Sequence, residues 1–154
     1  MKSNSISCFL FLFASLFILI SCDKVSSEDI QWYSFKDGMD ISKTNNKKVF
    51  IHFWANWCGY CTKMAKKTFK DPEIVTFLNE NFIAVKVNTD KEKDIASRYA
   101  VRGLPDNWFI SEDGEQIGNL PGYVPSDKMY LILKYISSDS YKKMDFNQFL
   151  STKK

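Results

Sequence analysis

The sequence predicts an α/β fold with a central mixed sheet: a parallel β-α-β half, then an antiparallel C-terminal hairpin, with helices on both faces. Two apolar runs, at 49–54 and 82–87, have almost no polar break, which is typical of parallel strands buried on both faces. Segments with helical spacing of apolar residues lie between the runs, and such alternation indicates strands joined by crossover helices. Asp113-Gly114, between two later apolar runs, predicts a hairpin turn.

The first half of the domain is expected to alternate helices and strands. A short helix that begins near Phe35 should end at the polar loop 43–47, and a second helix should begin at Cys58. Asp71 followed by Pro72 is typical of an N-cap and a first helical residue, so a third helix should precede the strand at 82–87. The residues expected to face the core from these helices are Phe35, Met39, Ile41, Met64, Ala65, Phe69, Ile74, Phe77 and Leu78.

The second half is expected to contain a short helix at 94–99, the hairpin and a closing helix. Ser126 and Asp127 resemble the cap of that helix, whose apolar face comprises Met129, Ile132, Leu133 and Ile136. The domain should therefore cover residues 30–137. Residues 138–154 are expected to form a polar, weakly amphipathic tail.

The first 21 residues are expected to be a signal peptide. Residues 9–20 are apolar over a length that is short for a membrane-spanning helix but normal for a signal peptide. The run ends in Leu19-Ile20-Ser21-Cys22, which resembles a bacterial lipobox, so lipidation of Cys22 is expected. Residues 22–29 would then be a tether to the membrane of the bacterial cell envelope, with the domain facing the periplasm or the exterior. The alternatives are an ordinary signal peptide and an uncleaved anchor helix.

Composition argues against a nucleic-acid partner. The 21 Lys and Arg residues are scattered and only slightly outnumber the 18 Asp and Glu residues, for a net charge of +3. The 154 residues are enough for one domain with its own core, and a monomer is expected.

A cysteine pair follows the first apolar strand directly, in Trp57-Cys58-Gly59-Tyr60-Cys61. A strand that delivers Cys58 to a helix N-terminus places its sulfur near unpaired backbone N–H groups and the positive end of the helix dipole. That environment favours the thiolate, which is the reactive form of cysteine. Cys58 is therefore the expected attacking nucleophile and Cys61 the resolving thiol.

The pair has two other interpretations. A zinc site needs about four ligands, but beyond Cys22 the chain has one histidine, His52, and no second cysteine pair. A static structural disulfide is the other alternative. Cleavage at the lipobox would remove Cys8 and acylate Cys22, leaving Cys58 and Cys61 as the only free thiols. A redox-active pair without metal or other cofactor is therefore favoured.

The order of elements, together with Phe53-Trp54-Ala55-Asn56-Trp57-Cys58-Gly59-Tyr60-Cys61, resembles the thioredoxin superfamily. Gly103-Leu104-Pro105 matches its loop carrying a cis-proline opposite the redox pair. Thr68-Phe69-Lys70-Asp71-Pro72-Glu73-Ile74, with Trp32, is similar to the periplasmic branch that includes the C-terminal domain of the membrane reductant transporter DsbD. The resemblance implies a thioredoxin-like fold and thiol–disulfide exchange through Cys58, Cys61 and Pro105.

The resemblance also implies a reductase of disulfide-containing extracytoplasmic proteins, with a membrane reductant transporter as a further partner. The alternatives are a disulfide oxidase or isomerase, and a lipoprotein in which the thiols bind a metal or serve haem-related chemistry. The resemblance implies a substrate groove bordered by Trp57, Gly59, Tyr60, Leu104 and Asp106.

Three positions depart from the usual thioredoxin pattern. His52 stands where thioredoxins place a buried acid, and Lys86 matches the lysine that accompanies that acid. A buried imidazole could act as the base for Cys61, or it could be a silent core residue. Tyr60 replaces a proline, and Asp106 replaces the usual threonine after the cis-proline.

Overall fold

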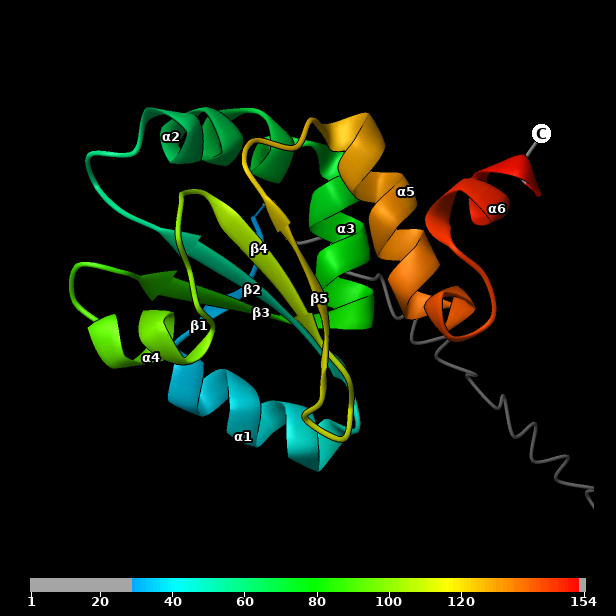
Figure 1. Cartoon of the computed structure of the whole chain (residues 1–154), viewed down its shortest axis with the longest axis horizontal. Helices are drawn as coiled ribbons and strands as arrows, with labels where there is room; N and C mark the ends of the chain where they lie inside the picture. The colour runs from blue at the N-terminus through cyan, green and yellow to red at the C-terminus, as the bar shows by residue number, and fades with distance from the viewer. Residues whose placement is uncertain (1–28, 153–154) are drawn as a thin grey trace, which may run out of the picture.

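The computed structural model describes residues 29–152, so the signal peptide, the lipidation at Cys22 and most of the tether lie outside the described residues. Five strands form one sheet in the order β1-β3-β2-β4-β5 (Figure 1). The strands are β1 (Trp32–Tyr33), β2 (Lys48–Trp54), β3 (Phe82–Asn88), β4 (Asp106–Ile110) and β5 (Gln116–Pro121). The helices are α1 (Phe35–Asn45), α2 (Gly59–Lys66), α3 (Pro72–Asn81), α4 (Lys93–Arg98), α5 (Ser126–Ser137) and α6 (Phe146–Ser151), with 3₁₀ helices η1 (Thr68–Lys70) and η2 (Ser140–Lys142).

The sheet is mixed, as the sequence predicts. Strand β3 pairs in parallel with β1 and β2, whereas β2 pairs with β4, and β4 with β5, in antiparallel fashion. The central strand β2 places His52 opposite Lys86 on one side and opposite Asn107 on the other. These three polar side chains therefore lie in one row across the middle of the sheet.

Helices cover both faces of the sheet, because alternate residues of β2 point to opposite sides. Phe50 faces the core formed with α3 and α5, whereas Val49, Ile51 and Phe53 face the core beneath α1 and α4. Figure 1 shows α1 and α4 on one side of the sheet, with α2, α3 and α5 on the other. All four of these β2 side chains have an exposed fraction of 0%.

Two helix boundaries differ from the sequence-based expectation. Helix α1 continues to Asn45 through most of the expected loop, and it ends where Ser42 donates a 2.6 Å hydrogen bond to the Lys47 carbonyl and Asn46 adopts a left-handed conformation. Helix α5 is capped by Pro125 without a side-chain bond, so the predicted cap at Ser126 and Asp127 is wrong: both are already helical.

The expected start of α3 is confirmed. The Asp71 side chain accepts the backbone N–H of Glu73 and Pro72 is the first helical residue. At α3 the capping side chain of Asp71 directly precedes Pro72, so both signals mark the same boundary, whereas at α5 the cap position is occupied by Pro125, one residue before Ser126.

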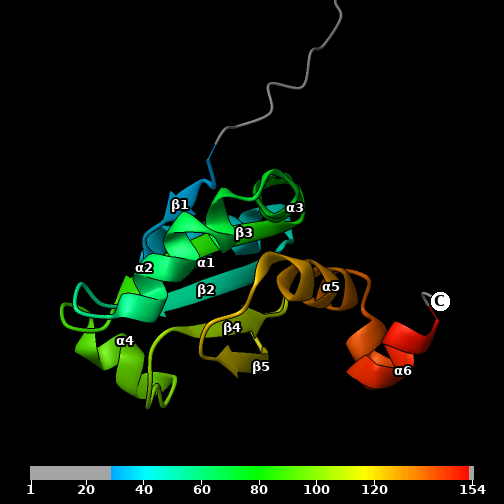
Figure 2. The ribbon, with the colours of Figure 1, turned by 90° about the horizontal axis from the view of Figure 1, so that it is seen from above.

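The segment expected to be an amphipathic tail contains η2 and α6, which pack against α5. Figure 2 shows α6 beyond the far end of α5. The Tyr135 hydroxyl donates a 2.6 Å hydrogen bond to the Met144 carbonyl, and the Tyr135 ring lies 5.4 Å from the Phe146 ring. The buried Lys48 ammonium pairs with Glu112 and, at 3.1 Å, with Asp139, which ties this segment to the hairpin.

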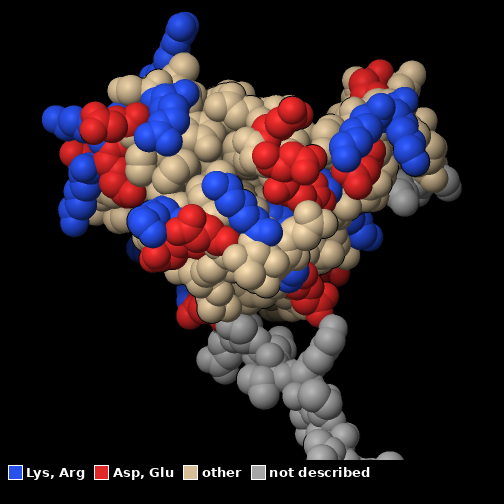
Figure 3. All heavy atoms as spheres, turned by 90° about the horizontal axis from the view of Figure 1, so that it is seen from below, with Lys and Arg blue, Asp and Glu red and all other residues tan. Residues whose placement is uncertain are grey.

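On the face seen in Figure 3, acidic and basic side chains are interspersed with neutral ones, without a broad area of one sign. Within residues 29–152, no helix is long and apolar enough to cross a membrane.

Candidate active site

The cysteine pair lies at the junction between β2 and α2. Cys58 is the N-cap residue of α2, and its sulfur accepts the backbone N–H of Cys61 at 3.0 Å. The two sulfurs form a disulfide with an S–S distance of 2.07 Å and a Cα–Cα distance of 5.2 Å. The strand-to-helix delivery expected from the sequence thus brings both thiols together at a helix N-terminus.

Both cysteines are enclosed by apolar neighbours. Cys58 and Cys61 have exposed fractions of 5% and 3%, and they cluster with Ala55, while Trp54 and Leu104 pack against the cluster. The adjacent Gly59 is exposed. The disulfide is thus covered on its inner side by the fold and flanked by exposed chain at the start of α2.

Two large side chains beside the disulfide are exposed. Trp57 has an exposed fraction of 71% and Tyr60 of 62%. The Trp57 indole N–H points to the Asp90 carboxylate, with distances of 3.1 and 3.2 Å to its two oxygens. This contact orients the Trp57 ring, and leaves an apolar surface next to the reactive sulfurs.

The loop before β4 also lies against the disulfide. The Leu104–Pro105 peptide bond is cis, and the half-buried Leu104 packs on the cysteine cluster. Across residues 29–152, the backbone N–H and C=O of Leu104 make no hydrogen bond. The Pro105 carbonyl, by contrast, accepts the Gly122 N–H at 2.7 Å.

Asp106 is placed differently from the other residues expected at the groove. Its side chain is buried, with an exposed fraction of 3%, and its carboxylate accepts hydrogen bonds from the Trp108 indole at 3.0 Å and from Asn119 at 3.0 and 3.1 Å. These contacts join β4 to β5. Asp106 thus supports the cis-proline loop from within, instead of presenting its carboxylate at the surface.

His52 is fully buried between the sheet and η1. The Asn107 amide donates to the Leu120 carbonyl at 3.1 Å, so its oxygen faces His52 Nδ1 at 2.8 Å, and this geometry assigns the imidazole proton to Nδ1. His52 Nε2 is buried and has no hydrogen-bond partner among the described residues. The ring contacts the rings of Phe69 and Trp32, at 4.9 and 6.1 Å.

Burial lowers the pKa of His52 to about 4; the Asn107 hydrogen bond opposes that shift, and the positive charge of Lys86 adds to it. The imidazole is therefore neutral at physiological pH. With so low a pKa, His52 is also a weak proton acceptor, which disfavours the role of base for Cys61.

Lys86 shares a pocket with His52 and Cys61. The pocket has a volume of about 190 Å³ and is lined by His52, Trp54, Ala55, Asn56, Cys61, Thr62, Ala65, Lys66 and Lys86. Burial lowers the pKa of Lys86, whose ammonium lies 5.2 and 5.1 Å from the ring centres of Trp32 and Trp54. No carboxylate in residues 29–152 pairs with Lys86. Its amine is therefore easier to deprotonate than that of an ordinary lysine.

Residues 29–152 contain no group of three or more His, Cys, Asp and Glu side chains that could hold a metal ion.

The structure thus gathers Cys58, Cys61, Leu104 and Pro105 at one place, with Trp57, Gly59 and Tyr60 exposed beside them. Sequence reasoning missed Asn107 and Asp90, which orient His52 and Trp57. Asn107 directly follows Asp106 on β4, so its alignment with His52 depends on strand register. Asp90 lies in a loop 33 residues beyond Trp57, and no local pattern marks it.

A CxxC disulfide capping a helix, faced by a cis-proline loop on a mixed five-stranded sheet, defines a thioredoxin-type thiol–disulfide oxidoreductase. Residues 35–137 match the family described as the thioredoxin-like domain, and the chain belongs to that family. It is 35% identical to the thioredoxin of Borreliella burgdorferi over 106 residues, which cover 68% of this chain and 86% of that protein. It is 32% identical to the thioredoxin of Mycoplasmoides gallisepticum, over 64% of this chain and 94% of that protein.

More distant similarities agree with this assignment. The thiol:disulfide interchange protein DsbD of Photorhabdus laumondii is 30% identical over 80 residues, which are 50% of this chain but only 14% of that protein. Among solved structures, a thioredoxin from Thermus thermophilus matches with a TM-score of 0.65 and 25% identity, covering 70% of this chain and 87% of its own. The protein is a thioredoxin-like thiol–disulfide oxidoreductase with the pair Cys58–Cys61.

The lowered pKa of His52 predicts a pH-dependent stability that His52→Gln removes. Between pH 6.5 and about 4 the unfolded chain binds a proton at this residue while the folded chain does not, so the wild type loses stability as pH falls. The loss attributable to His52 is about 3 kcal/mol at pH 4. Urea unfolding of both proteins from pH 7 to pH 4 measures the difference. Parallel curves, or an NMR titration of the single histidine near pH 6.5, would contradict it.

Proposed function

We propose that the protein is a reductase of disulfide bonds in extracytoplasmic proteins, with Cys58 as the attacking thiolate and Cys61 as the resolving thiol. The observation that carries this proposal is the position of Cys58 as the cap of α2, where its sulfur accepts the Cys61 N–H. In the reduced protein, the same N–H and the helix dipole would stabilise a negative charge on Cys58. Cys61 lies within the first turn of α2 and lacks that position.

The reaction consists of two exchanges. The Cys58 thiolate attacks one sulfur of the partner disulfide, the S–S bond breaks, and the other partner sulfur leaves as a thiolate. The Cys61 thiolate then attacks the Cys58 sulfur, the mixed disulfide breaks, and the partner sulfur that was bound to Cys58 leaves as a thiolate. Two electrons pass to the partner, and the Cys58–Cys61 disulfide seen in the structure is the oxidised product. A dithiol donor must reduce it before the next turnover.

The substrate is an extended segment that lies across the disulfide between two exposed surfaces. Trp57 and Tyr60 provide apolar contact on one side. Gly59, which follows Cys58 directly, has no side chain and leaves the approach to the sulfur open. On the other side, the unpaired backbone N–H and C=O of Leu104 are available to hydrogen-bond the segment beside Pro105. Asp106 holds this loop in place through Trp108 and Asn119.

The proton of Cys61 leaves through the pocket that it shares with His52 and Lys86. His52 Nε2 offers a buried hydrogen-bond acceptor, but a pKa of about 4 prevents it from holding the proton at neutral pH. Lys86 lines the same pocket, and burial lowers the pKa of its amine, which favours the neutral form that can accept a proton; no described carboxylate opposes this shift. His52 would then orient the thiol or a bridging water, and the amine of Lys86 would take the proton.

A membrane reductant transporter is the proposed electron donor, and the similarity to DsbD supports this choice. The lipobox at Leu19-Ile20-Ser21-Cys22 supports attachment to the bacterial cell envelope through lipidated Cys22. Two or more acyl chains would anchor the protein stably.

Cys58→Ser should abolish reduction of a protein disulfide such as that of insulin, because the attacking thiolate is lost. Cys61→Ser should instead accumulate mixed disulfides between Cys58 and its partners, because the second exchange cannot occur. Non-reducing electrophoresis and mass spectrometry of the trapped species measure both effects. Full turnover by Cys61→Ser, or trapping through Cys61 in the Cys58→Ser variant, would contradict the assignment.

The same assay tests the pocket behind Cys61. In stopped-flow measurements, His52→Gln and Lys86→Met should slow release from the mixed disulfide, with Lys86→Met slowing it by about a hundredfold if the amine is the base. Attack by Cys58 should change less in both variants. Wild-type release rates in folded variants across pH 6–9 would leave His52 and Lys86 as structural residues only.

Cys22→Ala should release the protein from membranes without changing its disulfide reduction, because the anchor and the redox site lie on different parts of the chain. The measurement is the distribution of each form between the detergent and aqueous phases of a cell lysate, together with the mass of the mature protein. Retention of Cys22→Ala in the detergent phase would point to an uncleaved anchor helix instead.

A further inference from the structure

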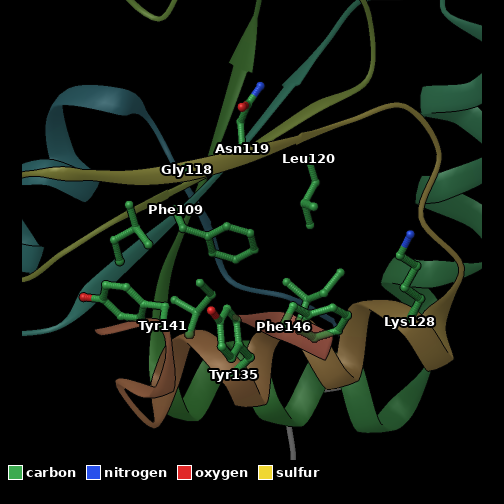
Figure 4. Close-up of a pocket in the computed structure, with 11 residues that line it drawn as sticks. Phe109, Gly118, Asn119, Leu120, Lys128, Tyr135, Tyr141 and Phe146 are labelled. Atoms are coloured by element: carbon green, nitrogen blue, oxygen red, sulfur yellow. The ribbon is translucent and has the colours of Figure 1, made fainter. Parts of the chain in front are cut away.

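A second pocket, of about 420 Å³, opens between β5 and α5, and its lining contains neither cysteine of the redox pair nor Trp57, Tyr60, Leu104 or Pro105. Figure 4 shows the strand above the pocket and α5 below it. Its lining comes from β4, β5, α5 and the segment after α5, and includes Phe109, Leu120, Lys128, Tyr135, Tyr141 and Phe146.

Most of the lining is apolar or aromatic. Phe109 and Leu120 point from the sheet toward α5 in Figure 4, and Tyr135 rises from α5 to meet them. Tyr141 and Phe146 complete the wall from the segment that follows α5. This segment lies beyond residue 137, where the match to the thioredoxin-like domain ends. The pocket is therefore built in part by residues outside the matched domain.

One cation lies at the rim of this apolar pocket. Lys128 is exposed on the first turn of α5, at the opposite end of the pocket from Tyr141 (Figure 4). Within residues 29–152, its ammonium makes no ion pair or hydrogen bond. The side chain that lines the pocket therefore brings an uncompensated positive charge to its edge, where an anionic group of a ligand would be attracted.

The edge strand leaves room for a ligand to approach closely. Gly118 lies in β5, the last strand of the sheet, and an added Cβ at this position would meet no atom within 4 Å. Glycine within a strand often marks a place where a ligand comes close to the backbone. Small-molecule sites commonly have volumes of roughly 300–1,000 Å³, mostly apolar walls and a few polar groups that fix orientation.

We propose that this pocket binds a small amphipathic anion, with an alkyl or aromatic body between β5 and α5 and its anionic group at Lys128. The apolar wall formed by Leu120, Tyr135 and Tyr141 accounts for the body, and the unpaired ammonium accounts for the charge. The proposal does not rest on disulfide reduction, because neither cysteine nor the cis-proline loop lines this pocket.

Decanoate is a suitable probe, and 1-decanol is its uncharged counterpart. In ¹H–¹⁵N NMR titrations of the wild-type chain, decanoate below its micelle concentration should shift the signals of Gly118 and Lys128 in a saturable, one-to-one manner. The signal of Cys58 should not move. Decanol should bind more weakly, because it lacks the charge that Lys128 attracts.

Two variants and one control separate the parts of the proposal. Lys128→Glu should weaken decanoate binding by about two- to fivefold, the range expected for the loss of an exposed ion pair. Decanol binding should be unchanged. Lys134→Glu makes the same change in net charge on α5, but Lys134 lies over the Tyr130 ring and not in the pocket, so decanoate binding should be kept. Ile117→Trp, at a half-buried position, should fill the pocket and weaken both probes by about tenfold.

Disulfide reduction by each variant reports whether it is folded, and the Lys128 comparison stands even if Ile117→Trp does not fold. Non-saturable shifts, shifts centred elsewhere, or equal effects of Lys128→Glu and Lys134→Glu would overturn the proposal. Undiminished binding by a folded Ile117→Trp variant would do the same.

Discussion

The proposed chemistry of this protein rests on one hydrogen bond at the start of α2, from the Cys61 backbone N–H to the sulfur of Cys58. It exists because β2, buried on both faces, ends at Trp54 and delivers Cys58 to the cap position. A helix N-terminus has backbone N–H groups without partners, and a sulfur placed there takes the role that a serine or aspartate oxygen usually has. The interaction that caps the helix is therefore also the one that favours a thiolate.

The sequence predicted the sheet, the helix starts at Cys58 and Asp71, and the redox pair, because each has a short local signal. Its errors lie where the deciding contact is distant or the local signals conflict. The end of α1 depends on Ser42 bonding to Lys47, and the cap expected at Ser126 gives way to Pro125. The inward turn of Asp106 depends on Trp108 and Asn119, which only the pairing of β4 with β5 brings together.

The substitution at His52 changes the electrostatics behind the resolving thiol. A buried acid at this position would carry negative charge near Lys86, whereas the neutral imidazole leaves the ammonium with two tryptophan rings as neighbours. Sequence alone identifies the substitution, but not its consequence, because the pKa of His52 depends on complete burial and on the orientation of Asn107. Burial therefore lowers the pKa of the Lys86 amine with no opposing carboxylate among residues 29–152.

Cys58 and Cys61 are expected to form a reversible redox couple instead of a static crosslink. The equilibrium reduction potential of the purified protein, measured by alkylation and mass spectrometry in glutathione or dithiothreitol buffers, distinguishes the two. A reversible couple should have a potential within the range of known thiol–disulfide exchange proteins, about −270 to −120 mV. A value below about −300 mV, typical of structural disulfides, would contradict it.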